Sequence, residues 1–327
     1  MSQIKLEKVL REFKLKPFTD GTHQNLVFDA QIWDETNGTS RFVRLIEDSL
    51  EAYADTCILD GDGNVLGSGE DPRPFRWRDS HCISVQTYSH DHGSVNKVFI
   101  CNEDRWITII TPLGLPVGKN WTPFVVNGEL HFIHGFSPFR VLKARFVSPK
   151  DNTMLVDVVA EHPLNGETSF DGFSRYRGGT AALQLGDLFF GIGHTNLRTS
   201  TKVEASTIHR PFLFVYQPDV SVTLFECDFE FAERFNIVDP TSLYVQNGRF
   251  YFVTCETETV WHVTPQEGRS CLYSVEIPKS LDVDSLCFGG RQLHQWSSDQ
   301  PERIWHRLRL FRWKEHSFAE VMTISNL

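Results

Sequence analysis

Apolar and polar residues alternate over short stretches along most of the chain, and a helical period is hard to find after residue 16. Alternation bounded by turn residues predicts half-buried β-strands. Several pairs of such stretches flank a two-residue turn, as in "TPFVV NG ELHFIHGF" at 122–136 and "PTSLYVQ NG RFYFVTCE" at 240–256. Asn-Gly supplies the positive φ angles of a type I′ turn, so each pair predicts a β-hairpin.

The hairpin pattern recurs along the chain. The second turn residues lie 41 to 61 positions apart, at Gly38, Asp79, Gly128, Asp187, Gly248 and Gly290. Most hairpins are followed by one or two further strand-like stretches, and four short strands per unit at this period are typical of a β-propeller. We therefore predict an all-β, single-domain β-propeller over residues 1–327, with six blades by repeat count. An irregular β-sandwich, or two stacked β domains, is the alternative.

The two ends of the chain are assigned within that scheme. Residues 1–20 are predicted to be an N-terminal extension, and residues 281–327 a C-terminal blade-like unit. No Gly/Ser/Pro-rich linker divides the chain, which favours one domain over two.

Charge and cysteine content narrow the function. The formal net charge is −10 and no Lys/Arg-rich block is present, so we expect no nucleic-acid partner. No apolar stretch reaches the roughly 18 residues of a membrane span, and the N-terminus lacks the apolar segment of a signal peptide. The seven scattered cysteines contain no CxxC, which favours reduced thiols and a cytoplasmic location. A secreted mature form that has lost its signal peptide is the alternative.

Polar residues gather just before or at the start of the first predicted strand of each unit. The first strand of each propeller blade lines the central channel, so these side chains are expected to converge at one channel mouth. Their carboxylates, cations and amides suit a polyhydroxylated ligand that carries an anionic group. They are Thr22, His23, Asn25, Glu70, Asp71, Arg73, Lys119, Asn120, Trp121, Arg177, Gly178, Gly179, Thr180, Asp239 and Thr241.

Four short motifs among these residues resemble one enzyme group. They are "EDPR" at 70–73, "KNW.PF" at 119–124, "RGGT" at 177–180 ahead of "GIGH" at 191–194, and the opening "HQNLVFDAQIWDETNGTSRFVRLI" at 23–46. Together, over roughly residues 22–260, they are similar to the β-mannoside phosphorylases and hydrolases and to the related protozoan β-1,2-mannosyltransferases. The resemblance implies a five-bladed propeller that cleaves or transfers a mannoside-like sugar.

The resemblance also implies roles for individual residues. Asp71 would be the general acid that protonates the glycosidic oxygen, with a pKa raised by burial or by Glu70. Asn25 and Arg44 would hold the sugar, together with Arg73, Lys119 and Asn120. Phosphate, where it replaces water as the acceptor, would be held by basic side chains. Those are Lys119, Arg140, Arg177, His194 and His209.

The sequence departs from the family pattern at two points. Gly118 stands where the family has an acid, and a second basic phosphate motif is not recognised. Water, phosphate and a second sugar, including a sugar nucleotide, therefore stay open as partners in the reaction. No cofactor and no metal are predicted, and "SHDH" at 89–92 is interpreted as a solvated hairpin tip.

Other interpretations of the same residues stay open. Asp71 can instead cap a strand and pair with Arg73, and Asp239, in a second Asp-Pro pair, is interpreted as structural. A non-catalytic propeller that binds a glycan or a protein is the second hypothesis for the whole chain. A biosynthetic cyclase or isomerase with an aromatic funnel is the third, because the chain holds 26 phenylalanines and 8 tryptophans.

Overall fold

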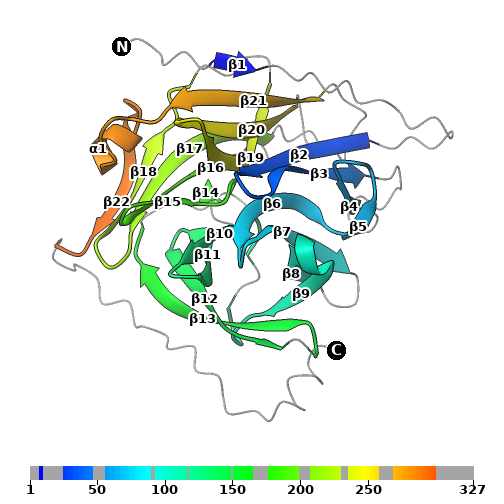
Figure 1. Ribbon diagram of the computed structural model, residues 1–327. Coiled ribbons are helices and arrows are strands. Elements are labelled where there is room, and N and C mark those ends of the chain that lie inside the picture. The colour runs from blue at the N-terminus through cyan, green and yellow to red at the C-terminus, as the bar shows by residue number, and fades with distance from the viewer. Residues whose placement is uncertain are drawn as a thin grey trace.

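Five antiparallel β-meanders surround a central axis in the computed structural model of the chain (Figure 1), and short parallel strand pairs join some neighbouring meanders into larger sheets. The structure describes residues 7–9, 25–46, 56–89, 93–115, 118–148, 150–164, 176–198, 207–229, 235–257 and 268–299. The first strand of each meander lies nearest the axis. The fold is therefore an all-β propeller with five blades in the described residues, and the sandwich alternative is wrong.

The first three blades follow the chain in order and contain four strands each. Blade 1 contains β2 (Asn25–Asp34), β3 (Gly38–Ile46), β4 (Thr56–Asp60) and β5 (Val65–Ser68). Blade 2 contains β6 (Glu70–Trp77), β7 (Ser80–Ser89), β8 (Gly93–Ile100) and β9 (Arg105–Ile110), with the 3₁₀ turn η1 (Cys101–Glu103) between the last two. Blade 3 contains β10 (Thr122–Val126), β11 (Glu129–Phe136), β12 (Phe139–Ser148) and β13 (Thr153–His162).

The last two blades recruit strands from the ends of the chain. Blade 4 contains β14 (Tyr176–Arg177) and β15 (Leu183–Leu185), both paired with β16 (Leu188–Arg198), then β17 (Thr207–Gln217) and β18 (Ser221–Glu226). Blade 5 contains β19 (Ile237–Gln246), β20 (Arg249–Thr257) and β21 (Gly268–Glu276). Its fourth strand is β1 (Glu7–Val9), which pairs antiparallel with β21. Residues 7–9 of the predicted extension thus complete the ring.

The predicted sixth blade is not formed within the described residues. The stretch around Gly290 contains a short helix, α1 (Val283–Leu286), and one strand, β22 (Gln292–Ser297), instead of a hairpin. β22 pairs with β18 and becomes the outermost strand of blade 4. The repeat count was wrong here because Gly289-Gly290 follows a helical turn that the Asp282 side chain caps. Residues 300–327 lie outside the described part of the chain.

The predicted turns are confirmed where both central residues have positive φ. This holds for Arg78-Asp79, Asn127-Gly128 and Asn247-Gly248, which close the first hairpins of blades 2, 3 and 5. These turns place one end of every innermost strand beside a hairpin and leave the other end, where the strand begins, on the opposite face of the ring.

Apolar layers between neighbouring blades hold the ring together. One layer packs Phe75 and Ile107 of blade 2 against Phe132 of blade 3, and another packs Ile192 of blade 4 against Phe250 of blade 5. Large β-branched and aromatic side chains fit such pleated, face-to-face packing. The abundance of phenylalanine is therefore explained chiefly by these layers. Among the described residues, no helix is long and apolar enough to cross a membrane.

Candidate active site

Charged side chains from all five blades meet at the channel end where the innermost strands begin. We call them the charged cluster, which comprises Arg44, Glu70, Asp71, Arg73, Lys119, Asn120, His194, His209 and Asp239. All of them except Lys119 are more than nine-tenths buried. The convergence predicted from the strand starts is thereby confirmed for Glu70, Asp71, Arg73, Lys119, Asn120 and Asp239. Arg44, His194 and His209, which lie within strands, join them.

Asp71 lies between two cations. Arg44 Nη1 is 2.7 Å from Asp71 Oδ1, and Arg44 Nη2 is 3.1 Å from Glu70 Oε2. Lys119 Nζ is 3.2 Å from Glu70 Oε2 and 3.9 Å from Asp71 Oδ2. The two acids of the "EDPR" motif are therefore held by cations from blade 1 and from the segment that precedes β10.

Arg73 connects this pair of acids to blade 5. Its Nη1 donates a hydrogen bond of 2.9 Å to the carbonyl oxygen of Pro240, and its guanidinium lies 5.6 Å from the centre of the Phe28 ring. The Nε and Nη2 atoms of Arg73 have no hydrogen-bond partner among the described residues. A fully buried guanidinium with unused donors is costly, and such groups are concentrated at ligand sites.

Asp239 forms the other half of the cluster with two histidines. His209 Nδ1 is 2.7 Å from Asp239 Oδ1, and His194 Nε2 is 3.9 Å from the same oxygen. The Asn120 amide nitrogen lies 3.4 Å from His194 Nε2. His194 Nδ1 and Asn120 Oδ1 find no partner within the described ranges.

The protonation states follow from burial and neighbouring charge. Burial alone raises the pKa of Asp71, but Lys119, Arg44 and Arg73 outweigh it and hold that pKa below its ordinary value. The expected raised pKa is therefore wrong for this ligand-free site. Burial lowers the pKa of His194 to about 3, so its imidazole is neutral at pH 7. Burial alone raises the pKa of Asp239. The electrostatic effects of His209 and His194, together with the hydrogen bond from His209, outweigh burial and lower that pKa.

Backbone irregularities aim these side chains inward. Asp71 has a φ of 53° and Asn120 a φ of 61°, values uncommon for residues other than glycine. The pairing of β6 with β7 shifts register between Glu70 and Arg73, and that of β19 with β20 shifts between Pro240 and Ser242. A bulge of this kind re-aims the neighbouring side chains.

Close backbone contact also positions Asn120. A Cβ on Gly178 would lie 2.0 Å from the Asn120 carbonyl oxygen and 2.6 Å from Thr122 Oγ1. Only glycine fits there, because the two backbones approach each other closely. Blade 4 thus presses directly on the segment that carries Lys119 and Asn120.

The remaining predicted residues lie beside the cluster or apart from it. Arg177 pairs in register with His194. When the Asn196 carboxamide is oriented with its oxygen toward the guanidinium, both terminal nitrogens of Arg177 lie 2.9 Å from that oxygen. Arg140 lies on β12, where it pairs with Glu161 of β13 at 2.7 Å, so its ion pair is not with the cluster. The side chain of Asn25 lies outside the described part of the chain, as do residues 90–92 of "SHDH".

Asp239 is the residue whose role the sequence interpretation understated. It precedes a proline at the start of β19, as Asp71 precedes a proline at the start of β6, and a register shift occurs at both places. The repeated Asp-Pro pair was interpreted as a sign of structure. It equally marks two matching positions that face the same channel end.

Three members of the cluster have the donor types of a metal site. The ligand atoms of His194, His209 and Asp239 lie within 4.8 Å of one another, and nitrogen and carboxylate oxygen donors suit zinc or a related ion. The same three atoms are also accounted for by hydrogen bonding, because His209 and Asp239 already pair at 2.7 Å. The arrangement of the three side chains is thus compatible with metal binding and with hydrogen bonding alone.

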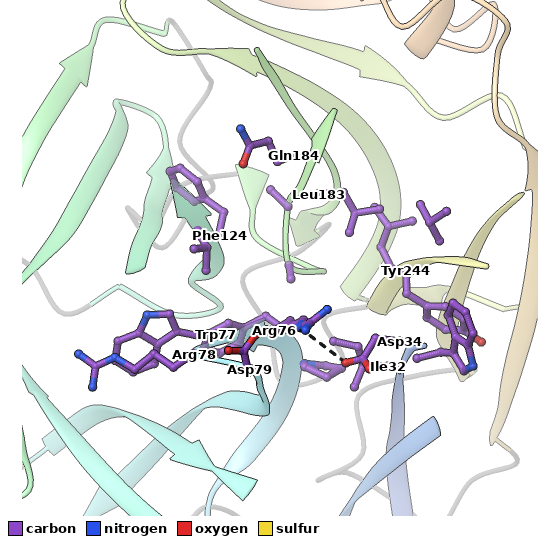
Figure 2. A pocket seen from close by; sticks show the side chains of 18 of the residues that line it. Ile32, Asp34, Arg76, Trp77, Arg78, Asp79, Phe124, Leu183, Gln184 and Tyr244 are labelled. Atoms are coloured by element: carbon purple, nitrogen blue, oxygen red, sulfur yellow. Dashed lines mark hydrogen bonds and ion pairs between the residues drawn. The ribbon is translucent and has the colours of Figure 1, made fainter. Parts of the chain in front are cut away.

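The two channel ends differ in free space. At the charged cluster the space bounded by Asp71, Arg73, Gln86, Asn96 and Trp121 measures about 10 Å³, enough for roughly one water molecule. A cavity of about 630 Å³ lies at the opposite end, among the hairpin turns (Figure 2).

No protein-family model matches the sequence, and no curated protein matches it significantly. Solved structures do resemble the chain. One is a structure from the GH130 family of mannoside phosphorylases, which contains glycoside hydrolases that target β-1,2-mannosidic linkages in Candida mannan. Its TM-score is 0.45 at 6% identity, covering 77% of this chain and 84% of that one. A putative glycoside hydrolase from Bacteroides ovatus has a TM-score of 0.48 at 9% identity, covering 81% and 89%.

An α-L-arabinofuranosidase from Lactobacillus brevis is similar to the same degree. Its TM-score is 0.48 at 11% identity, covering 81% of this chain and 92% of that one. The likeness in all three is one of general fold. The assignment of five blades rests on the strand pairing of this chain itself.

Proposed function

We propose that the chain is a carbohydrate-active enzyme that cleaves or transfers a mannoside-like glycosyl unit at the charged cluster. The observation that carries the proposal is the cluster itself, in which three carboxylates and three cations meet largely out of water. Burying ionised groups costs free energy that a purely structural core of similar volume does not. Functional sites are where such a cost is commonly retained.

The chemistry of the cluster supports a sugar as the ligand. Glycoside-processing enzymes use two carboxyl groups on either side of the glycosidic bond, and Asp71 and Asp239 come from different blades and face the same channel end. Guanidinium and amide groups, such as those of Arg73 and Asn120, can bind several hydroxyl groups at once. The motifs that resemble the mannoside-processing enzymes also fall largely on this cluster.

Asp71 is proposed as the proton donor. Its carboxylate is ionised while Lys119 and Arg44 contact it, so donation requires a change when substrate binds. A sugar hydroxyl that displaces the partly exposed Lys119 ammonium would remove the largest of the charge effects that lower the Asp71 pKa. The pKa would then rise, and the protonated acid could serve the leaving oxygen.

Asp239 and His209 are proposed to act on the acceptor. A carboxylate that orients an imidazole at 2.7 Å can position or deprotonate a water molecule or a sugar hydroxyl. Arg177 and His194 flank the same position and would contact phosphate if the reaction is phosphorolysis. Water, phosphate and a second sugar each remain candidate acceptors, and the cytoplasmic location remains a prediction.

The test is turnover with matched carboxylate variants. Wild type, Asp71→Asn and Asp104→Asn are incubated with β-linked mannobioses, with and without inorganic phosphate, and with GDP-mannose plus mannose. Asp104 is exposed on the turn before β9 and has a φ of 45°, which asparagine tolerates. We expect turnover in wild type and Asp104→Asn, and a loss of about 10²-fold or more in Asp71→Asn. Absence of turnover on every substrate would contradict the proposal.

A non-catalytic sugar-binding propeller is the second candidate. Two observations favour it, namely the lowered pKa of Asp71 and the space of only about 10 Å³ beside it. Sugar binding without turnover, equal in wild type and Asp71→Asn, would identify this alternative. The aromatic-funnel hypothesis gains little at this end, because paired charges form the lining.

A further inference from the structure

A second free space lies at the opposite end of the channel from the charged cluster. The cavity measures about 630 Å³ and is lined by the ends of the innermost strands of all five blades (Figure 2). This volume falls within the range of roughly 300–1,000 Å³ that is typical of small-molecule sites.

The cavity is separate from the charged cluster. On β6, Asp71 and Arg76 are five residues apart, which is about 17 Å along a strand. Between the two ends, Thr241 Oγ1 donates to the Asp29 carbonyl oxygen at 2.7 Å, and Arg73 Nη1 donates to the Pro240 carbonyl oxygen at 2.9 Å. The two spaces share no lining residue.

One side of the cavity carries ion-paired groups. Arg76 Nη2 lies 3.3 Å from Asp79 Oδ1, and Arg76 Nε lies 3.9 Å from Asp34 Oδ2. Figure 2 shows Arg76 directed toward Asp34. Arg78 lies 4.3 Å over the Trp77 ring. Two arginines and two aspartates give a formal sum of zero, so the cavity offers no net charge to attract an ion.

Asp34 is held firmly in that position. It accepts hydrogen bonds from the backbone nitrogens of Thr36 at 2.8 Å and Asn37 at 2.6 Å, and His81 Nε2 lies 2.7 Å from its Oδ2. Its partners therefore come from its own turn and from blade 2. A fixed carboxylate beside a planar guanidinium offers a ligand hydrogen-bond acceptors and donors in a set geometry.

The facing walls are apolar and aromatic. Phe124 and Tyr244 flank the space, and Leu183 and Gln184 lie across it from Arg76 (Figure 2). Phe124 and Tyr244 are nearly fully buried, whereas the Gln184 side chain is exposed. The cavity thus combines largely apolar walls with planar polar groups and balanced charge.

We propose that this cavity is a second ligand site, and that it binds a neutral saccharide. Sugar C–H faces pack against aromatic and apolar walls, while hydroxyl groups exchange hydrogen bonds with the carboxylate, guanidinium and carboxamide groups. The four charges of the lining sum to zero, so net charge favours neither a phosphate nor a cation. The site does not depend on catalysis at the charged cluster.

The test measures binding of β-1,2-mannotriose and cellotriose by calorimetry and by ligand-detected NMR. Gln184→Trp fills the cavity from an exposed position, and Arg76→Ala removes the guanidinium that links the two aspartates. Arg145→Ala is the matched control, because Arg145 is exposed on β12 and pairs with Asp157 outside the cavity. All proteins carry Asp71→Asn, so that turnover at the charged cluster does not consume the probe.

We expect one trisaccharide to bind, with affinity reduced about tenfold or more in both cavity variants and unchanged in Arg145→Ala. Unaltered binding in Gln184→Trp, or no binding of either trisaccharide, overturns the proposal. Binding of indole in place of the sugars, abolished by Gln184→Trp, overturns the saccharide assignment as well. Turnover in the Asp71 series is unaffected by these outcomes, so the two proposals fail separately.

Discussion

Arg44 reaches from the second strand of blade 1 to Asp71 at the start of blade 2. The guanidinium lies 2.7 Å from the Asp71 carboxylate and 3.1 Å from that of Glu70. All three side chains are more than nine-tenths buried. One arginine thus pairs with two largely buried acids, and it ties the first two blades together at the channel.

Replacing Arg44 by methionine should lower the free energy of unfolding by about 3–5 kcal/mol at pH 7, because two buried carboxylates lose their partner. The folded-state pKa of Asp71 lies below its unfolded value in wild type, so its stabilisation is present above about pH 4 and lost as the pH falls further. The difference in free energy of unfolding between wild type and Arg44→Met should therefore become smaller toward pH 3. Urea unfolding at both pH values measures it.

Arg145→Met is the control for that series, since this arginine is mostly exposed and should change stability by no more than about 1 kcal/mol. An equal loss at pH 7 and pH 3 would mean that Arg44 stabilises by packing and not by charge.

His194 should make the protein sensitive to acid. Its folded-state pKa is about 3, and an unfolded histidine has a pKa near 6.5. Between these values only the unfolded state binds the proton, so stability should fall by up to about 1.4 kcal/mol for each pH unit below about 6.5. His194→Gln should reduce that slope, as measured by urea unfolding at pH 7, 5 and 4. If the dependence of stability on pH were the same in His194→Gln as in wild type, a group other than His194 would be responsible for it.

Gly178→Ala should displace side chains of the charged cluster, although Gly178 is not itself a member of it. The added methyl group would lie 2.0 Å from the Asn120 carbonyl oxygen, so either β14 or the Lys119–Asn120 segment must move. We expect a destabilisation of about 1–3 kcal/mol and weaker sugar binding. Thermal unfolding and calorimetry measure the two effects.

Gly186→Asn is the comparison for that variant, because no atom lies within 4 Å of the Cβ position at Gly186 and asparagine tolerates its φ of 64°. Binding should persist in it. If both glycine variants bound sugar as wild type does, the proposed positioning of Asn120 would be wrong.

Deletion of residues 1–10 should open the ring. It removes β1, whose three residues pair with Leu272, Tyr273 and Ser274, and it leaves β21 as an uncovered edge. Each lost backbone hydrogen bond is worth about 1 kcal/mol, so a lower melting temperature and self-association are expected. Deletion of residues 1–5 stops short of β1 and should have little effect. Equal behaviour of the two truncations would show that the pairing contributes nothing.

Local signals in the sequence were sufficient for the hairpins and for the convergence at the channel. Asn127-Gly128 and Asn247-Gly248 dictate their own turn geometry, and the alternation on either side dictates which face is buried. Asp71, Lys119 and Asn120 were found because they stand at strand starts. These properties depend only on neighbouring residues.

Features that depend on contacts between residues far apart in the sequence could not be predicted from these local signals. The Gly289-Gly290 pair looks like the other turns, yet the Asp282 cap makes a helical turn before it, and β22 then finds an open edge on β18. The protonation of Asp71 was predicted in the wrong direction because Arg44 and Lys119 reach it from other blades. The side chains around a carboxylate decide its pKa, and sequence spacing does not reveal them.

The last blade unites residues 7–9 with residues 268–276. During synthesis the first of these segments leaves the ribosome well before the second, by on the order of tens of seconds at about 5–20 residues per second. Blades 1 to 3 and the inner strands of blade 4 can assemble in that interval, while residues 7–9 stay unpaired until β21 is made, and β18 lacks its outer partner until β22 follows. The outer strands of blades 4 and 5 are therefore the last parts of the ring to form.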